Sequence, residues 1–269
     1  MALPLTSIVA RLEQLAPLAF AEAWDNVGLL LEPAPVADVS VQTALLTIDL
    51  SDDVVAEAEE RGAQLIIAYH PPIFQGLKRL RSSQPGERAL LRCIARGITV
   101  YSPHTAVDAA PGGVNDWLLE PFGAGERAPL VAHPADARFG QGRGMRLAVP
   151  LSLTDAVSCI KLHLGLNHVR LAAAARHAAG QPITSIAVCA GAGGSVFEKL
   201  TNFDLYLTGE MRHHDVRVRV EHGSSVVLCD HTNTERGYLP RLAEQLRAAA
   251  AGAAEFHVAA CDRDPLAIT

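Results

Sequence analysis

The stretch Thr43-Ala44-Leu45-Leu46-Thr47-Ile48-Asp49 decides the fold, because it begins a pattern that the chain then repeats. Its apolar run predicts a buried strand that ends at Asp49. Helices and strands alternate after it: we expect helices at 52–61 and near 87–96, and strands at 64–69 and 98–101. Two consecutive β-α-β units predict a parallel sheet with right-handed crossovers.

Metal-capable side chains follow the predicted strands. Asp49, His70 and His104 stand at three strand ends, Asp108 comes shortly after His104, and His231 follows a later apolar run. Ligands of open α/β sheets bind beyond the carboxyl ends of the strands. Each residue also has a structural explanation, such as helix capping or turn formation, but their convergence favours a shared metal site.

The chain beyond residue 144 predicts a second α/β segment. We expect a helix at 154–163; the expected strands are 145–149, 169–173, 186–189, 204–207 and 226–228. The Gly- and Pro-rich stretch 122–144 shows little apolar periodicity and is interpreted as a linker or crossover. The turn Gly191-Ala192-Gly193-Gly194-Ser195 could hold phosphate, but it lacks the Lys-Ser/Thr ending of a Walker loop, so a plain tight turn is preferred.

Two local pairs allow alternative interpretations. Thr232 and Glu235 have the spacing of a capping box if a helix begins near Thr232, whereas His231 and Glu235 would be close enough to share an ion. Glu210 and His214 have helical i, i+4 spacing, which fits either a solvated helix start or an acid/base pair. The stretch Trp24–Leu29 is interpreted, from composition alone, as a turn anchored by a buried Trp.

Composition restricts the classes of function. The chain has 269 residues, of which 49% are hydrophobic and only 5% aromatic, so we expect an aliphatic α/β core in one or two domains. A formal charge of −6 argues against nucleic-acid or anionic-membrane binding. The five cysteines contain no C-x-x-C pair and predict reduced core thiols. With no run of about 20 apolar residues and no signal-like start, we expect a soluble cytoplasmic protein.

Five motifs, in order, resemble the Nif-three-like family, whose members often carry the label of a second type of GTP cyclohydrolase I. They cover nearly the whole chain. The motifs are Trp24-Asp25-Asn26-Val27-Gly28-Leu29; Tyr69-His70-Pro71-Pro72-Ile73-Phe74; Ser102-Pro103-His104-Thr105 with Asp108; Thr208-Gly209-Glu210 with His213-His214; and His231-Thr232-Asn233-Thr234-Glu235-Arg236-Gly237.

The resemblance implies a fold of two α/β domains with layered sheets and helices, and a dinuclear metal centre between the domains. It implies a discontinuous first domain, 1–126 plus 237–269, a second domain, 127–236, and a ring-shaped homohexamer formed as a trimer of dimers. Carried over to this chain, the metal ligands are His70, Asp108, His231 and Glu235.

One position departs from the family pattern, because Tyr69 stands where many bacterial members have a first histidine. A phenol with a pKa of about 10 is a poor ligand at neutral pH. His104 is the obvious substitute ligand, although a supporting role beside the metal is preferred for it. Glu210 and His214 are the other residues expected to move protons.

Imidazole and carboxylate ligands suit two divalent ions, zinc, manganese or iron, and such a pair lowers the pKa of bound water toward 7. The first functional hypothesis is therefore a metal-dependent hydrolase of a nucleotide or phosphorylated small molecule, with GTP as the family label. The alternative is a non-enzymatic metal carrier, chaperone or regulatory scaffold.

Overall fold

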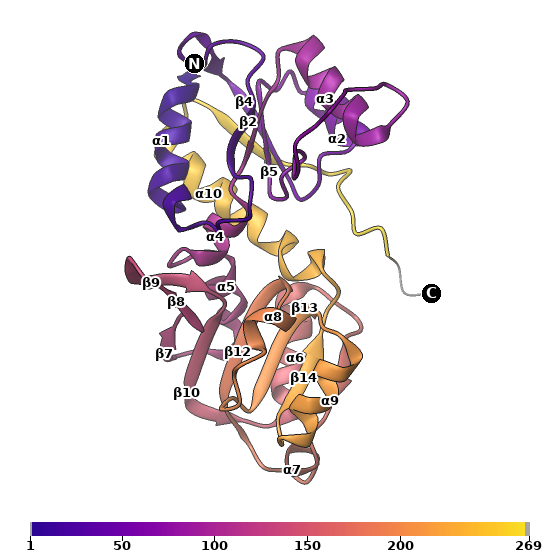
Figure 1. Cartoon of the computed structure of the whole chain (residues 1–269). Helices are drawn as coiled ribbons and strands as arrows, with labels where there is room; N and C mark the ends of the chain where they lie inside the picture. Colours follow the sequence, from indigo (N-terminus) through magenta and orange to yellow (C-terminus); the bar gives the residue numbers. More distant parts are fainter. Residues whose placement is uncertain (1, 267–269) are drawn as a thin grey trace. The chain divides into compact units, whose positions relative to one another are not determined.

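The computed structural model describes residues 2–266, and the chain divides into two compact units. One unit contains the chain up to Val107 and again from Tyr238 onward, and the other is Asp108–Gly237. Each unit is built of strands and helices, which Figure 1 draws as arrows and coiled ribbons coloured along the sequence. The segment 108–126, expected in the first domain, lies with the second unit because α5 (Val114–Leu118) contacts β12 (Ile183–Ala192).

A five-stranded sheet forms the centre of the first unit. Its central strands are parallel and only the edge strand β2 is antiparallel, as the β-α-β pattern predicts. In spatial order the strands are β15 (Glu255–Val258), β4 (Thr43–Thr47), β5 (Leu65–Ala68), β6 (Thr99–Ser102) and β2 (Gly28–Leu31). A separate two-stranded pair joins β1 (Leu3–Pro4) to β3 (Ser40–Val41).

Two helices cover one face of this sheet. Side chains of α2 (Asp52–Glu60) and α3 (Pro85–Arg96) pack in one buried cluster with Leu45, Ile66 and Val100 of three neighbouring strands. The Ser51 hydroxyl accepts a hydrogen bond from the backbone N–H of Val54, which confirms the predicted helix start. The apolar runs of the strands are continuous because helices cover the opposite face as well.

The first and last helices of the chain lie on the opposite face of the sheet. In Figure 1, α1 (Leu5–Leu15) and α10 (Leu239–Ala250) lie on the side of the sheet away from α2 and α3. The last helix also contacts β15 and β4. Short 3₁₀ turns complete this unit, together with α4 (His104–Ala109), which crosses from one unit into the next; the turns are η1 (Leu18–Phe20) and η2 (Val36–Asp38).

A six-stranded mixed sheet forms the second unit. The parallel strands β12, β13 and β14 lie inside it, and antiparallel strands flank them. In spatial order the strands are β11 (Arg170–Ala172), β14 (Ser225–Leu228), β13 (Leu205–Glu210), β12 (Ile183–Ala192), β10 (Arg143–Leu151) and β7 (Gly125–Ala128).

Helices again cover this sheet. Phe197 of α8 (Gly194–Phe197) and Val216 of α9 (His213–Glu221) pack on one face around Tyr206. The remaining elements are α6 (Leu153–Leu164), α7 (Ala175–Ala178), η3 (Glu120–Phe122), η4 (Thr232–Thr234) and η5 (Arg236–Tyr238).

The interpretation of 122–144 as a linker is wrong. The segment contains β7 and the hairpin formed by β8 (Val131–His133) and β9 (Asp136–Gln141), and β10 begins inside it. Most of its side chains are exposed, so neither face of these strands carries an apolar pattern. Gly140 and Gly142 have positive φ angles, which is why glycine stands in an otherwise extended segment.

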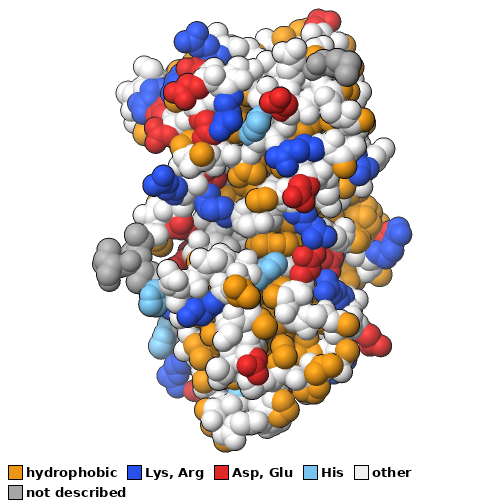
Figure 2. Space-filling view, turned by 180° about the vertical axis from the view of Figure 1, so that it is seen from behind, with side chains coloured by type: hydrophobic (Ala, Val, Ile, Leu, Met, Phe, Trp, Pro, Cys, Tyr) orange, Lys and Arg blue, Asp and Glu red, His pale blue; other side chains and the backbone are white. Residues whose placement is uncertain are grey.

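The surface and the membrane criterion agree with the composition. Figure 2 shows Lys and Arg side chains interspersed with Asp and Glu on the face drawn, without a continuous basic area. None of the helices within residues 2–266 combines the length and hydrophobicity needed to cross a bilayer. All five cysteines are free thiols; Cys93, Cys189 and Cys229 are buried as predicted, whereas Cys159 and Cys261 are only partly buried.

The segment after β15 is held to the first unit by Glu57. Its carboxylate accepts hydrogen bonds from the N–H groups of Ala260 (2.9 Å) and Cys261 (3.1 Å). Partial burial alone raises the pKa of Glu57, but these bonds outweigh it and lower the pKa from 4.5 to about 2. The charged form is therefore favoured in the folded state.

We predict that Glu57→Gln lowers the free energy of unfolding at pH 7 by about 1–2 kcal/mol, because charge-assisted hydrogen bonds are lost. Because folding lowers the pKa of Glu57, the charged carboxylate stabilises the folded state at pH values above its unfolded pKa of about 4.5. This contribution is lost as the pH falls toward about 2. Urea unfolding at pH 7 and pH 3 measures both effects. Glu60→Gln, an exposed change on the same helix, is the control, and an equal loss in the two variants would contradict the assignment.

Candidate metal-binding site

Three strand-end residues of the first unit meet at one edge of its sheet. Asp49, His70 and His104 follow β4, β5 and β6, as predicted from the apolar runs. His70 Nδ1 lies 2.9 Å from Asp49 Oδ1, and the rings of His70 and His104 have centroids 5.4 Å apart. Because parallel strands end on the same side, three short loops bring these polar groups together.

His104 is oriented by a carboxylate that the composition-based interpretation overlooked. Its Nδ1 lies 2.9 Å from Asp25 Oδ1, and the Asp25 side chain is fully buried. Thr105 donates to the same carboxylate from its N–H (3.1 Å) and its hydroxyl (2.5 Å). Burial alone raises the pKa of Asp25, but the bonds from His104 and Thr105 outweigh it and lower the pKa.

The backbone of His104 is also unusual. Its φ angle is +24°, in the region that favours glycine, which costs about 1–3 kcal/mol for other residues. The bonds of Asp25 to His104 and Thr105 hold this turn in place. The conformation therefore directs the imidazole toward the sheet edge at an energetic cost, which is typical of functional positions.

Tyr69 packs beneath the two imidazoles. It is 1% exposed, and its ring lies edge-on to those of His70 (5.4 Å) and His104 (5.9 Å). Tyr69 is thus a buried aromatic support for the two imidazoles.

In the second unit, His231 lies between two carboxylates. Its Nδ1 is 3.3 Å from Glu210 Oε2, and its Nε2 is 3.4 Å from Glu235 Oε1. Glu210 ends β13, and His231 follows the neighbouring parallel strand β14. Glu235 is 3% exposed and ends the 3₁₀ turn η4. The structure thus brings Glu210, His231 and Glu235 together.

Two glycines make room for this group. A Cβ atom on Gly191 would lie 2.7 Å from Glu235 Oε1 and 2.8 Å from His231 Nε2, and its φ angle is +62°. A Cβ atom on Gly209 would lie 2.7 Å from the Cα of His231. The N–H of Gly191 donates to the Thr234 hydroxyl (2.8 Å). The glycine turn therefore accommodates the His231 and Glu235 side chains, which agrees with a tight turn rather than a phosphate loop.

Asp108 lies near the same group in the second unit. Burial raises the pKa of the Cys189 thiol, and the charges of Asp108 and Glu235 raise it further, so both carboxylates lie within electrostatic range of one sulfur atom. The backbone oxygen of Asp108 accepts a hydrogen bond from the Asn115 side chain (3.0 Å). A divalent cation would compensate two carboxylates held near a buried thiol.

Several local expectations are corrected. Glu210 and His214 do not share a helical face, because Glu210 ends a strand and α9 begins only at His213. His214 is exposed and lies against the His213 ring, and its predicted role in proton transfer stays a prediction.

A 3₁₀ turn replaces the helix expected near Thr232, and Glu235 Oε1 lies 3.4 Å from His231 Nε2. The Asn233 side chain donates to the Cys229 carbonyl (2.8 Å).

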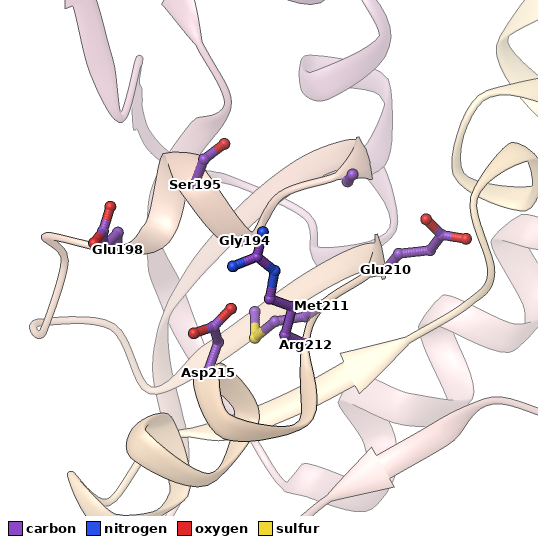
Figure 3. A pocket seen from close by; sticks show the side chains of 8 residues that line it. Gly194, Ser195, Glu198, Glu210, Met211, Arg212 and Asp215 are labelled. Atoms are coloured by element: carbon purple, nitrogen blue, oxygen red, sulfur yellow. The ribbon is translucent and has the colours of Figure 1, made fainter.

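A cavity of about 660 Å³ adjoins Glu210 in the second unit. Its lining includes Ser195, Arg212 and Asp215 as well as Glu210. In Figure 3, the Glu210 side chain projects away from Arg212 and Asp215. Glu210 therefore lines the cavity, and its carboxylate also lies 3.3 Å from His231 Nδ1.

The family assignment follows from comparison with known sequences. The sequence model of the family Duf34/NIF3 (NGG1p interacting factor 3) matches residues 3–265. The chain belongs to this family. It is 39% identical over 262 residues to NIF3-like protein 1 of Drosophila melanogaster, which covers 97% of this chain and 88% of the relative.

A second relative supports the family assignment, and a solved structure supports the fold. The chain is 44% identical over 226 residues to the NIF3 homolog of Schizosaccharomyces pombe, which covers 81% of this chain and 80% of the relative. A solved Bacillus cereus protein related to NIF3 has a TM-score of 0.85, 20% identity and 98% coverage of both chains. The predicted family and the α/β fold are confirmed.

The donor set of the second unit fits a metal ion. Two ligand atoms at about 2.1 Å from a tetrahedral ion lie about 3.4 Å apart. The distance between His231 Nε2 and Glu235 Oε1 is 3.4 Å. A carboxylate only accepts, so the contact with Glu210 favours the His231 proton on Nδ1 and makes Nε2, beside Glu235, the nitrogen through which the ring would bind a metal ion.

We predict that Gly191→Ala destabilises the metal-free protein by about 1–2 kcal/mol, because the added methyl group needs a strained φ and overlaps His231 and Glu235. Gly194→Ala is the control, since its Cβ would meet its nearest neighbour at 3.6 Å. Urea unfolding in the presence of EDTA measures the difference. Equal stability of the two variants would contradict the crowding at Gly191.

Proposed function

We propose that the protein is a metal-dependent hydrolase of a nucleotide or phosphorylated small molecule. The observation that carries the proposal is the position of His231, with one ring nitrogen at a carboxylate that orients it and the other 3.4 Å from the buried Glu235 carboxylate. Metal-binding histidines typically donate their second ring nitrogen to a carboxylate in this way.

The same pairing recurs in the first unit. His70 and His104 each place Nδ1 at 2.9 Å from a carboxylate, that of Asp49 or Asp25. A carboxylate partner favours the proton on Nδ1, so Nε2 is the nitrogen through which each ring would bind a metal ion or accept a proton. Turn formation or helix capping does not require three imidazoles that are each paired with a carboxylate through Nδ1.

We propose His70, Asp108, His231 and Glu235 as the ligands of two divalent ions, zinc, manganese or iron. His70 belongs to the first unit and the other three belong to the second. When bound, such a metal pair supplies hydroxide near neutral pH and neutralises developing negative charge.

The remaining residues divide the protein's part of the chemistry. His104, held by Asp25, has the orientation of a general base or acid and is not needed as a ligand. Glu210 keeps the proton of His231 on Nδ1. A carrier or scaffold that only binds metal has no use for a base held in this way, which favours the hydrolase over the non-enzymatic alternative.

The resemblance to the family extends the proposal. GTP is the first substrate to test, with attack of water on the purine imidazole ring and loss of formate. We also propose a cytoplasmic homohexamer, a trimer of dimers. The formal charge of −6 disfavours nucleic acid as a partner.

We predict that the double variant His231→Ala, Glu235→Ala loses at least half of the bound metal of the wild type, because two of the four proposed ligands are removed. Elemental analysis of purified protein measures the metal content. His213→Ala, a change of an exposed histidine on α9, is expected to keep the wild-type content. A double variant with unchanged metal would overturn the site.

We predict that Asp25→Asn lowers kcat about ten- to hundred-fold with metal content unchanged, because an amide no longer fixes the proton of His104. Metal-loaded protein is screened against nucleotides and phosphoesters, and kcat is then measured as a function of pH. Asp53→Asn, an exposed change on α2, serves as the control. Metal binding without turnover of any of these substrates would instead support the carrier.

A further inference from the structure

Two aromatic side chains next to the imidazoles of the first unit are exposed. The expected buried Trp is not found, because Trp24 is 59% exposed and Phe74 is 49% exposed. They are the aromatic members among the exposed large apolar side chains of residues 2–266. Their ring centroids lie 5.9 Å apart, with planes inclined by 48°. They form an aromatic pair with accessible π faces.

The backbone beside each ring is fixed. Asp25, directly after Trp24, is buried and bonded to His104 and Thr105. The Asn26 side chain donates to the carbonyl of Ile73, directly before Phe74, at 2.5 Å. The loops that carry the two rings are therefore joined to each other and to the start of α4. Trp24 and Phe74 are therefore exposed in ordered positions, because the polar side chains of Asp25 and Asn26 form hydrogen bonds within the protein.

The aromatic pair borders the proposed chemistry. The Trp24 and His104 rings are 6.1 Å apart, edge to face, and the His70 ring lies 5.4 Å beyond that of His104. A flat ring stacked on Trp24 would place its substituents beside the imidazole that Asp25 orients. This proximity connects the pair to the substrate of the same site.

We infer that Trp24 and Phe74 form a stacking site for the planar heteroaromatic ring of the substrate, such as a nucleobase. The inference rests on the proposed function, because the substrate is the one processed beside His70 and His104. Aromatic side chains can stack on any nucleobase, because every base has a π face. Inclined rings contact a flat ligand by the face of one and the edge of the other.

Tryptophan fluorescence of the full chain tests the inference. Trp117, the other tryptophan, is 7% exposed, so the difference between the wild type and Trp24→Phe isolates Trp24. The probes are adenosine and guanosine 5′-monophosphates, with ribose 5-phosphate as the probe without a base, each with zinc and with EDTA. We expect saturable quenching by both nucleotides and none by ribose 5-phosphate.

Variants of exposed residues then assign the contact without threatening the fold. Trp24→Leu and Phe74→Leu are expected to weaken nucleotide binding about ten- to hundred-fold, measured by calorimetry. Leu80→Ala removes exposed apolar surface without a π face and should leave binding unchanged. Equal weakening by Leu80→Ala, equal binding of ribose 5-phosphate, or no saturable quenching would overturn the stacking site.

Other outcomes distinguish the stacking site from the hydrolase. Stacking that persists in EDTA without any turnover supports this inference and counts against the proposed function. Metal-dependent turnover of a nucleotide that Trp24→Leu leaves unchanged supports the proposed function and counts against the stacking site. A change of oligomeric state in Trp24→Leu with intact nucleotide binding would show that a second copy covers the pair, and would overturn the inference.

Discussion

The hydrogen bond from a histidine Nδ1 to a carboxylate is the interaction on which the candidate site depends. It occurs at His70 with Asp49, at His104 with Asp25 and at His231 with Glu210. In each case the carboxylate favours the proton on Nδ1 and orients the ring, so that Nε2 is the nitrogen through which the ring would bind a metal ion. Parallel strands bring His70 and Asp49, and likewise His231 and Glu210, to one sheet edge, whereas Asp25 reaches His104 from the loop before the antiparallel strand β2.

The sequence was sufficient for the framework of the site and insufficient for its partners. Continuous apolar runs located β4, β5 and β14, and the polar residues that follow them include His70 and His231. The partner of His104 is 79 residues away, and no local pattern specifies a bond over that separation. The motif around Asp25 was visible in the sequence, but its composition suggested only a turn.

The incorrect sequence interpretations concern segments that are exposed or short. The strands β7–β9 lie at a sheet edge or in a small hairpin, so few apolar residues mark them. The spacing of Glu210 and His214 fitted a helix, although β13 extends through Glu210 before the chain turns. A four-residue interval occurs in both conformations, and only the packing of the neighbouring strands decides between them.

The discontinuity of the first unit constrains how the protein forms. β15 pairs with β4 in the register Glu255 with Thr43, so the first sheet gains its edge strand only when nearly the whole chain exists. The second unit, Asp108–Gly237, is continuous and has all its strands before then. During synthesis the middle of the chain can therefore become compact while the earlier part waits for its last strand, an order opposite to that of the sequence.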